Sequence, residues 1–284
     1  MAPGDCNTSP WSRLPREAPS FPRDGARGVT VGCVLHTGAA HHRPMDTREP
    51  LEYLPADGAP ELLFLLFHGV GGTPCDMLPL MDRLAAEYPR AALVAIPAPD
   101  PFDAVPGGGA GGQWFSVRGI DEQNRPLRVA TTMLRFVRAV RAQQARFGID
   151  VPHTALVGFS QGAIMALEAA QQEPHLAGRV LAFCGRHALL PDHGPADTTL
   201  HLLNGMDDTV MPPGPVVDAA RQLVALGADV TADVLPDIGH ELHPLLVERA
   251  IGHLRSFLPK RAWRDALGEA PVRNRVASSR ELGR

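Results

Sequence analysis

At the centre of the chain stands the stretch Gly158-Phe159-Ser160-Gln161-Gly162, a GxSxG pentapeptide. A short apolar run that ends near Val157 precedes it, and a helical pattern that begins near Gln161 follows it. A sharp turn between a strand and a helix brings neighbouring backbone very close, and glycine tolerates such an approach best. The pentapeptide therefore predicts a serine exposed at the end of a strand, facing the N-terminus of a helix.

Outward from this turn, short apolar runs alternate with helical patterns from Glu61 onward, which is typical of parallel βα units. Several runs are apolar at consecutive positions, as expected for strands covered by helices on both faces. The predicted strands are residues 62–67, 91–96, 154–157, 180–183, 200–203 and 230–235, and the predicted helices are residues 76–87, 127–147, 161–172, 216–226 and 243–257. This order predicts the α/β-hydrolase fold, a mostly parallel sheet with helices on both faces and no large cap domain.

The length of 284 residues, 44% of them hydrophobic, suits one large core better than two independent domains. We expect a disordered N-terminal extension at residues 1–55, a catalytic domain at 56–262 and a C-terminal tail at 263–284. The extension is rich in Pro, Gly and Arg and has no sustained apolar period. Three interpretations of the extension are open: it precedes a true start at Met45, it is a neutral tail, or it is a targeting segment. Its acidic residues argue against a transit sequence.

The charge balance, 27 Lys and Arg against 31 Asp and Glu, gives no reason to expect nucleic acid. The longest apolar run, residues 62–67, is far shorter than the roughly 20 residues of a membrane span, so stable membrane insertion is not expected. The four cysteines form neither a CxxC pair nor a disulfide framework. We therefore expect a cytoplasmic protein with no metal and no cofactor. The glycines 107, 109 and 112 match GxGxxG, but no strand precedes them as a dinucleotide site requires.

A serine nucleophile needs a histidine base and a carboxylate that orients the histidine, and in this fold they follow the serine in the order acid, then histidine. The predicted strand 200–203 leads into a loop with two candidate acids, Asp207 and Asp208. The predicted strand 230–235 leads into a loop with His240, the expected base, and His243 is the alternative one turn further on.

The glycine-rich loop after the first long strand, residues 67–72, is expected to supply half of an oxyanion hole. We expect the two donors to be the backbone amides of Val70 and Gln161. His68 lies in the same loop, and we expect it to support the loop rather than to accept protons.

Taken together, these segments resemble the small bacterial carboxylesterases of the phospholipase/carboxylesterase family, close relatives of acyl-protein thioesterases. The matching pieces are residues 62–71, 113–117, 158–163, 205–212 and 239–240, so the resemblance spans residues from about 60 to 260. The departures from the family pattern are the long N-terminal extension and the glycine cluster before Gln113.

The resemblance also implies roles for single residues. The family's acid loop resembles Gly-x-x-Asp-x-Val-x-Pro, and this register selects Asp208 over Asp207. By the same carry-over, Ser160 and His240 match the nucleophile and the base, and Val70 and Gln161 match the oxyanion donors. Trp114 and Phe115 match a loop beside the active site, where they either contact substrate or simply pack.

The function that we expect is that of a serine esterase, which cleaves short to medium acyl esters or thioesters through a Ser-His-Asp triad and an acyl-enzyme. The partner is then a small-molecule ester or thioester. A lysophospholipase or an acyl-protein thioesterase is the alternative within the family. An acyltransferase or a peptidase would use the same triad, and a non-catalytic binding protein with the same fold is the alternative from another class.

Overall fold

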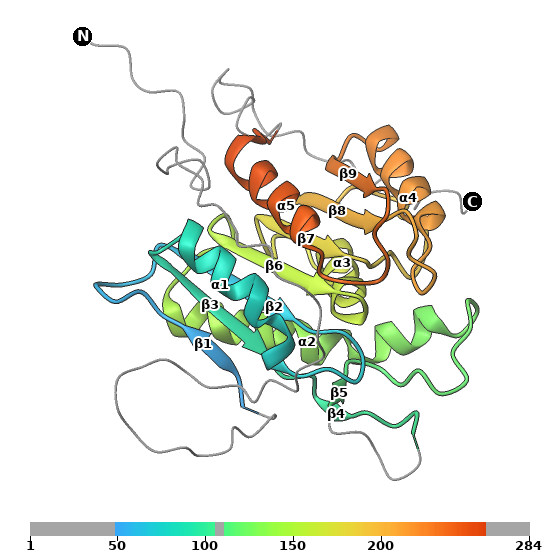
Figure 1. Cartoon of the computed structure of the whole chain (residues 1–284), viewed down its shortest axis with the longest axis horizontal. Helices are drawn as coiled ribbons and strands as arrows, with labels where there is room; N and C mark the ends of the chain where they lie inside the picture. Colours follow the sequence, from blue (N-terminus) through green and yellow to red (C-terminus); the bar gives the residue numbers. More distant parts are fainter. Residues whose placement is uncertain (1–48, 106–110, 260–284) are drawn as a thin grey trace, which may run out of the picture.

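The computed structural model describes residues 49–105 and 111–259, and a seven-stranded sheet runs through the middle of this part of the chain (Figure 1). The strand order is β1-β3-β2-β6-β7-β8-β9. Only β1 is antiparallel to its neighbour, and the other pairs are parallel. The strands are β1 Leu51–Tyr53, β2 Leu62–Phe67, β3 Ala91–Ile96, β6 Thr154–Phe159, β7 Arg179–Phe183, β8 Thr199–Gly205 and β9 Asp229–Leu235. The predicted mostly parallel sheet is confirmed.

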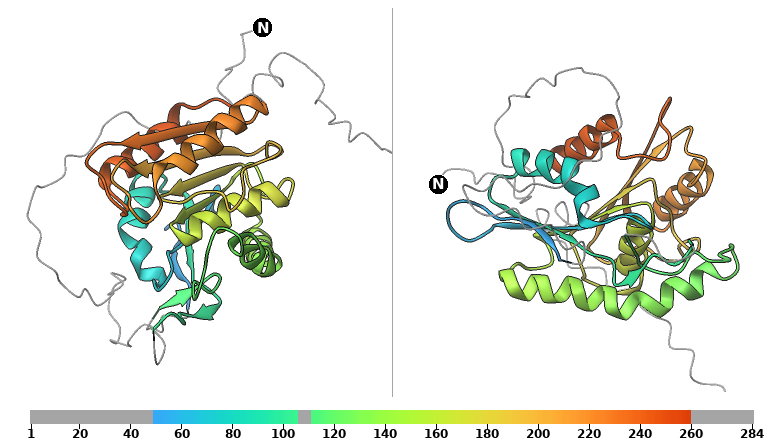
Figure 2. Two further views of the ribbon diagram at one scale, coloured as in Figure 1. Left: turned by 90° about the vertical axis from the view of Figure 1, so that its right-hand side faces the viewer. Right: turned by 60° about the horizontal axis from the view of Figure 1, so that its bottom comes forward.

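Helices cover both faces of this sheet (Figure 2). One face carries α1 Leu78–Glu87 and α5 Pro244–Ser256, whose apolar residues share one buried cluster. The other face carries α2 Arg125–Phe147, α3 Gln161–Gln172 and α4 Pro213–Ala225, whose apolar residues belong to a second cluster. The architecture is therefore a three-layered α/β fold, as the sequence predicted.

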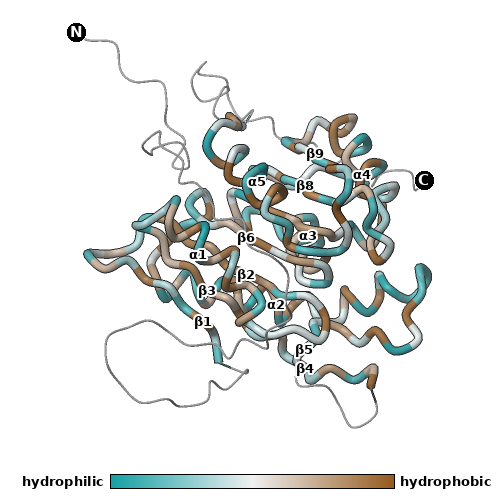
Figure 3. The backbone as a smooth tube through the Cα atoms, in the orientation of Figure 1, coloured by the Kyte–Doolittle hydropathy of each residue, from teal (hydrophilic) through white to brown (hydrophobic). Residues whose placement is uncertain are grey.

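The central strand β2 shows how the sequence builds this arrangement. Successive side chains of a strand point to opposite faces, so a strand buried on both faces is apolar at every position. Leu63, Leu65 and Phe67 pack with the helices of the second cluster, and the alternate residues pack with α1 and α5. Figure 3 shows the same pattern, with hydrophobic colours along the central strands and alternating colours along the helices. Each buried side chain of this kind contributes about 1.5 to 3 kcal/mol.

The N-terminal boundary predicted at residue 55 is wrong, because Leu51–Tyr53 is already a strand. Leu51 is 1% exposed and lies opposite Ala95 of β3. Three residues are too few to show an alternating pattern, and their strand conformation depends on pairing with β3. The described residues do not include residues 1–48, among which is Met45. They also leave out residues 106–110, which contain most of the glycine cluster, and the tail from residue 260.

Two helices begin earlier than predicted, and in both cases proline explains the difference. We expected α2 to begin at residue 127, but it begins at Arg125 with Pro126 in its first turn. Similarly, α4 begins at Pro213 rather than at residue 216. Proline favours the first turn because the missing N–H has no intrahelical partner there anyway. The short ribbon of β4 Asp100–Pro101 and β5 Gly112–Gln113 and the 3-10 helix η1 Pro74–Met77 were not predicted.

None of the helices in residues 49–105 and 111–259 is long and apolar enough to span a membrane.

His201 of β8 is a fully buried imidazole beneath the sheet face that α5 covers. Its Nδ1 lies 2.9 Å from the hydroxyl of Thr231, and its ring stacks on His253 with 5.1 Å between centroids. Burial, with Arg179 and His253 nearby, holds the pKa of His201 well below its ordinary value of 6.5. The folded protein therefore keeps this ring neutral.

The stability of the protein should therefore decrease as the pH falls below about 6.5. The unfolded chain protonates His201 in this range and the folded chain does not, so the unfolded state binds more protons. One such histidine contributes a slope of up to about 1.4 kcal/mol per pH unit. Denaturant unfolding between about pH 7.5 and 5.5 should show a shallower slope for His201→Gln than for the wild type. His175→Asn is the control, because the side chain of His175 is 62% exposed. Equal slopes in the wild type and His201→Gln would contradict the assignment.

Candidate active site

The carboxyl ends of β6, β7, β8 and β9 meet at one edge of the sheet, and Ser160 lies at the sharpest turn there. Its backbone has a positive φ of 52° with ψ −115°, a strained conformation outside the left-handed helical region, and its N–H donates to the carbonyl of Phe183 at 2.9 Å. A Cβ on Gly162 would lie 2.1 Å from the carbonyl oxygen of Phe67, and one on Gly158 would lie 2.4 Å from the backbone of Ala163. Both flanking glycines are therefore required by close backbone approach.

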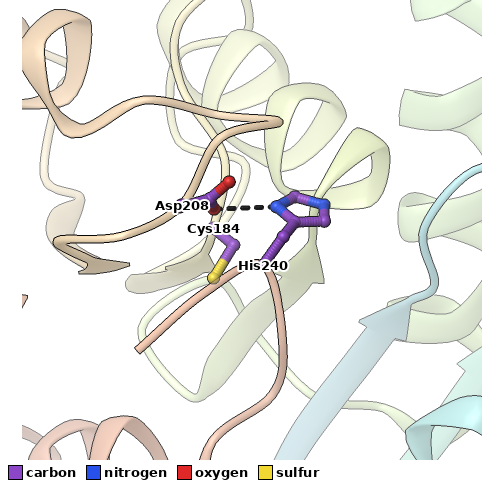
Figure 4. A group of neighbouring side chains, drawn as sticks. All are labelled: Cys184, Asp208 and His240. Carbon is purple, nitrogen blue, oxygen red and sulfur yellow. Dashed lines mark hydrogen bonds and ion pairs between the residues drawn. The ribbon is translucent and has the colours of Figure 1, made fainter. Parts of the chain in front are cut away.

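A continuous chain of hydrogen bonds runs from Ser160 through His240 to Asp208. The Nε2 of His240 lies 2.9 Å from the Oγ of Ser160. The Nδ1 of His240 lies 2.7 Å from Oδ2 of Asp208, the bond drawn in Figure 4. Since a carboxylate only accepts, Nδ1 carries the proton, and Nε2 is left to accept from the serine hydroxyl. This is the arrangement in which a histidine can take the proton of a serine nucleophile.

The two aspartates of the acid loop differ in burial and in hydrogen bonding. Oδ1 of Asp208 accepts from the backbone N–H groups of Val210 and Met211, at 2.9 and 2.7 Å, so Oδ2 is turned to His240. The side chain of Asp208 is fully buried, whereas Asp207 is exposed. The structure therefore brings Asp208, not Asp207, to the histidine.

The alternative base, His243, has another role. It is the N-cap of α5, where its Nδ1 accepts from the N–H of Leu245 at 3.2 Å. A side-chain acceptor at this position satisfies one of the free amides of the first helical turn. The structure thus gives His243 a capping role and leaves His240 as the histidine that contacts Ser160.

The proposed oxyanion loop is held from beneath by His68, which is fully buried. Its Nε2 accepts from the N–H of Ala98 at 3.0 Å, so its proton is on Nδ1, which donates to the carbonyl of Gly69 at 2.7 Å. Burial lowers the pKa of His68, which favours this neutral form. His68 therefore supports the loop, as the sequence predicted.

The two amides expected to form the oxyanion hole are available. Within the described ranges, the N–H groups of Val70 and Gln161 have no hydrogen-bond acceptor. Gln161 is the first residue of α3, where a free amide is a property of every helix start. The positive end of the helix dipole lies at the same point, beside Ser160.

The side chain of Gln161 has a role that sequence reasoning missed. Its Oε1 accepts from the N–H of Trp114 at 2.8 Å, and its Nε2 donates to the carbonyl of Phe115 at 2.7 Å. The Gln161 side chain therefore fixes the segment of Trp114 and Phe115 to the N-terminus of α3, beside Ser160. The only signal in the sequence is that Gln161 directly follows Ser160, and this gives no information about the distant segment that it binds.

Trp114 and Phe115 are each 3% exposed and belong to the core. The Nε1 of Trp114 donates to the carbonyl of His68 at 2.9 Å, and its ring packs edge-on against Phe67 and Phe136. Of the two roles left open by the sequence, the burial favours packing. A direct substrate contact by either residue stays a prediction.

Among the described residues, one group of histidine, cysteine and carboxylate atoms is compact enough to hold a metal ion, namely Cys184, Asp208 and His240. Their ligand atoms lie within 4.8 Å of one another. The His240 and Asp208 atoms are, however, joined by a hydrogen bond, and burial raises the pKa of the Cys184 thiol to about 12. Metal ligation requires the thiolate, so the neutral thiol makes this a poor metal site.

Comparison with known proteins assigns the chain to a family. A family model described as phospholipase/carboxylesterase matches residues 54–258. The chain belongs to this family. Esterase YpfH of Escherichia coli strain K12 is 42% identical over 211 residues, which are 74% of this chain and 89% of the relative. The crystal structure of esterase PE8 matches with a TM-score of 0.67 and 25% identity, over 73% of this chain and 98% of that protein.

Acyl-protein thioesterase 2 of Zea mays matches with a TM-score of 0.59 and 18% identity, over 72% of this chain and 97% of that protein, and this likeness concerns the fold alone. Membership of the phospholipase/carboxylesterase family confirms the resemblance, the α/β-hydrolase fold and the expectation of a carboxylesterase-type hydrolase.

The acid loop gives the first test of the site. Asp208→Asn should reduce kcat by orders of magnitude, because the amide cannot hold His240 in the required tautomer; the equivalent change in a serine protease costs about 10⁴-fold. Asp207→Asn should retain near wild-type activity, because Asp207 is exposed and its side chain does not contact His240. Steady-state hydrolysis of a chromogenic ester measures both. Similar losses of activity in the two variants, or a larger loss in Asp207→Asn, would show that Asp208 is not the residue that orients His240.

Proposed function

We propose that this member of the family is a serine esterase that cleaves acyl esters or thioesters through an acyl-enzyme on Ser160. The observation that carries the proposal is the continuous hydrogen-bond chain from the Oγ of Ser160 through both nitrogens of His240 to Asp208. Each member comes from the end of a different strand, as expected of a catalytic site in an α/β protein. The esterase names of two relatives support the same reaction.

In the first half of the reaction, the Oγ of Ser160 attacks the acyl carbonyl while Nε2 of His240 takes the hydroxyl proton. Negative charge then develops on the carbonyl oxygen, and in this proposal the amides of Val70 and Gln161 donate to it. The imidazolium of His240 gives its proton to the departing alcohol or thiol. The acyl group is left as an ester of Ser160.

In the second half, His240 accepts a proton from water, and the water oxygen attacks the acyl-enzyme carbonyl. Collapse of the second tetrahedral intermediate releases the carboxylic acid and returns the proton to Ser160. Asp208 stabilises the imidazolium in both halves. Its own position is fixed by the amides of Val210 and Met211.

The acyl preference follows from the side chains on the loops around the triad. Met206 and Val210 flank Asp208 on the acid loop and are 53% and 60% exposed, and Leu189 and Leu190 on the loop after β7 are similarly exposed. We infer that the exposed Met206 and Val210 offer an apolar shelf beside Asp208 rather than a deep tunnel, and the chain between α3 and β8 adds no further helix to cover it. Such a shelf favours short to medium acyl groups over the long chains of a lysophospholipase or a depalmitoylating thioesterase.

Labelling of Ser160 separates a working esterase from a binding protein with the same fold. A fluorophosphonate should label the wild type, and Ser160→Ala should lose both labelling and ester hydrolysis, to below about 1% of wild type, since no other group supplies the nucleophile. Ser256→Ala, on the exposed surface of α5, is the control and should behave as wild type. Turnover by folded Ser160→Ala above a few per cent would refute the nucleophile, and an unlabelled, inactive wild type would favour a binding protein.

The acyl preference should appear as a maximum in kcat/KM across esters of increasing chain length. Each methylene that reaches the shelf adds up to about 0.8 kcal/mol, or roughly fourfold, and longer chains gain nothing more. Val210→Ser should lower kcat/KM for medium-chain esters but not for acetate. Val224→Ser is a matched control, because Val224 is 62% exposed near the far end of α4. Trp114→Ala would be a poorer probe, since this side chain packs in the core. A steep rise toward the longest chains would contradict the proposal and indicate a deep tunnel.

A further inference from the structure

Cys184 occupies the strand end beside the triad and is used by none of the steps above. It directly follows β7, is fully buried and has a left-handed backbone with φ 48°. Its N–H donates to the carbonyl of Leu203 on β8, the strand that leads to the acid loop. The residue before it, Phe183, accepts the N–H of Ser160. The backbone at this point is therefore bonded to both the nucleophile turn and the strand of the acid.

The thiol of Cys184 contacts the backbone on either side of His240. Its Sγ lies 3.4 Å from the carbonyl oxygen of Glu241 and 3.9 Å from that of Gly239. These carbonyls belong to the two residues on either side of His240. As Figure 4 shows, the side chain lies between the loop of the acid and the loop of the histidine.

The chemistry of a thiol suits this position. Burial raises the pKa of Cys184 to about 12, so the side chain remains a neutral, weak donor beside the Asp208 carboxylate. A carboxylate here would repel Asp208, and a β-branched residue would be strained at a positive φ. Alanine would leave space for the His240 loop to move, and the near-attack geometry of an active site is sensitive to shifts of about 1 Å.

We propose that Cys184 is a positioning residue, whose thiol donates to the carbonyl of Glu241, packs against that of Gly239 and thereby keeps the imidazole of His240 aligned with Asp208. The residue takes no part in proton or acyl transfer. It acts only through the Asp208–His240 hydrogen bond, so this inference rests on the proposed function.

A double-mutant cycle with Asp208 tests the proposal. Cys184→Ala should lower kcat by about 10-fold or more with KM within about twofold, because misalignment affects the transition state more than substrate binding. In the Asp208→Asn background the same change should have little further effect, because the alignment that the thiol maintains is already lost. Cys184→Ser retains a donor on a shorter side chain and should recover part of kcat. Cys75→Ala, at the other cysteine of the described residues, is the control and should behave as wild type.

The outcomes separate this inference from the proposed function. An unchanged kcat in Cys184→Ala, a change in KM alone, or an equal loss in both backgrounds would overturn the positioning role and leave the triad intact. Wild-type activity in Asp208→Asn would overturn the triad and the positioning role together. The melting temperature of each variant is measured first. If Cys184→Ala does not fold, Cys184→Ser is carried through the same cycle. A loss of kcat in the chain that keeps Asp208, with no further loss in Asp208→Asn, then supports the proposal.

Discussion

The strained turn at Ser160 is the constraint on which the rest of the structure depends. A non-glycine residue in a sparsely populated backbone region costs about 1 to 3 kcal/mol and persists only where its surroundings determine it. Here two features determine the turn. The flanking glycines let the start of α3 lie against the carbonyl of Phe67 at the end of β2, and the N–H of Ser160 donates to the carbonyl of Phe183. The buried central strands supply the rigidity that holds this turn, and they hold Ser160 in contact with His240 although the serine itself is only 4% exposed.

A second strained residue, Cys184, lies at the end of the neighbouring strand. Parallel strands place their carboxyl ends at one edge, and the chain must leave each of them sharply if the loops are to converge on one point. The acid loop meets the histidine loop in the same way, since a Cβ on Gly205 would lie 2.0 Å from the carbonyl oxygen of Ile238. Backbone contacts between neighbouring strand ends thus bring Ser160, Asp208 and His240 together.

How much the sequence could predict depends on how local the cause is. The strands at residues 62–67 and 91–96 and the helix at 161–172 have the predicted bounds, because long apolar runs and a GxSxG turn mark them. The strand at residues 51–53 is too short for a pattern and exists through its pairing with β3. Asp208 and Asp207 are neighbours of the same type, so residue chemistry alone left both open and the family register decided between them. The roles of Gln161 and Cys184 involve partners more than 40 residues away, on which the local sequence carries no information.

Trp114 and Phe115 have a structural role that the exposed residues of the acid loop do not have. The amide of Gln161 binds the backbone of Trp114 and Phe115, and the indole of Trp114 binds the carbonyl of His68, so this segment connects the nucleophile helix to the oxyanion loop. Replacement of Gln161 or Trp114 would therefore break hydrogen bonds that join these segments. The exposed apolar residues of the acid loop have no such duty, because Asp208 is held by backbone amides of that loop rather than by its side chains. The side chains of Met206 and Val210 can therefore change without altering the backbone bonds that hold Asp208.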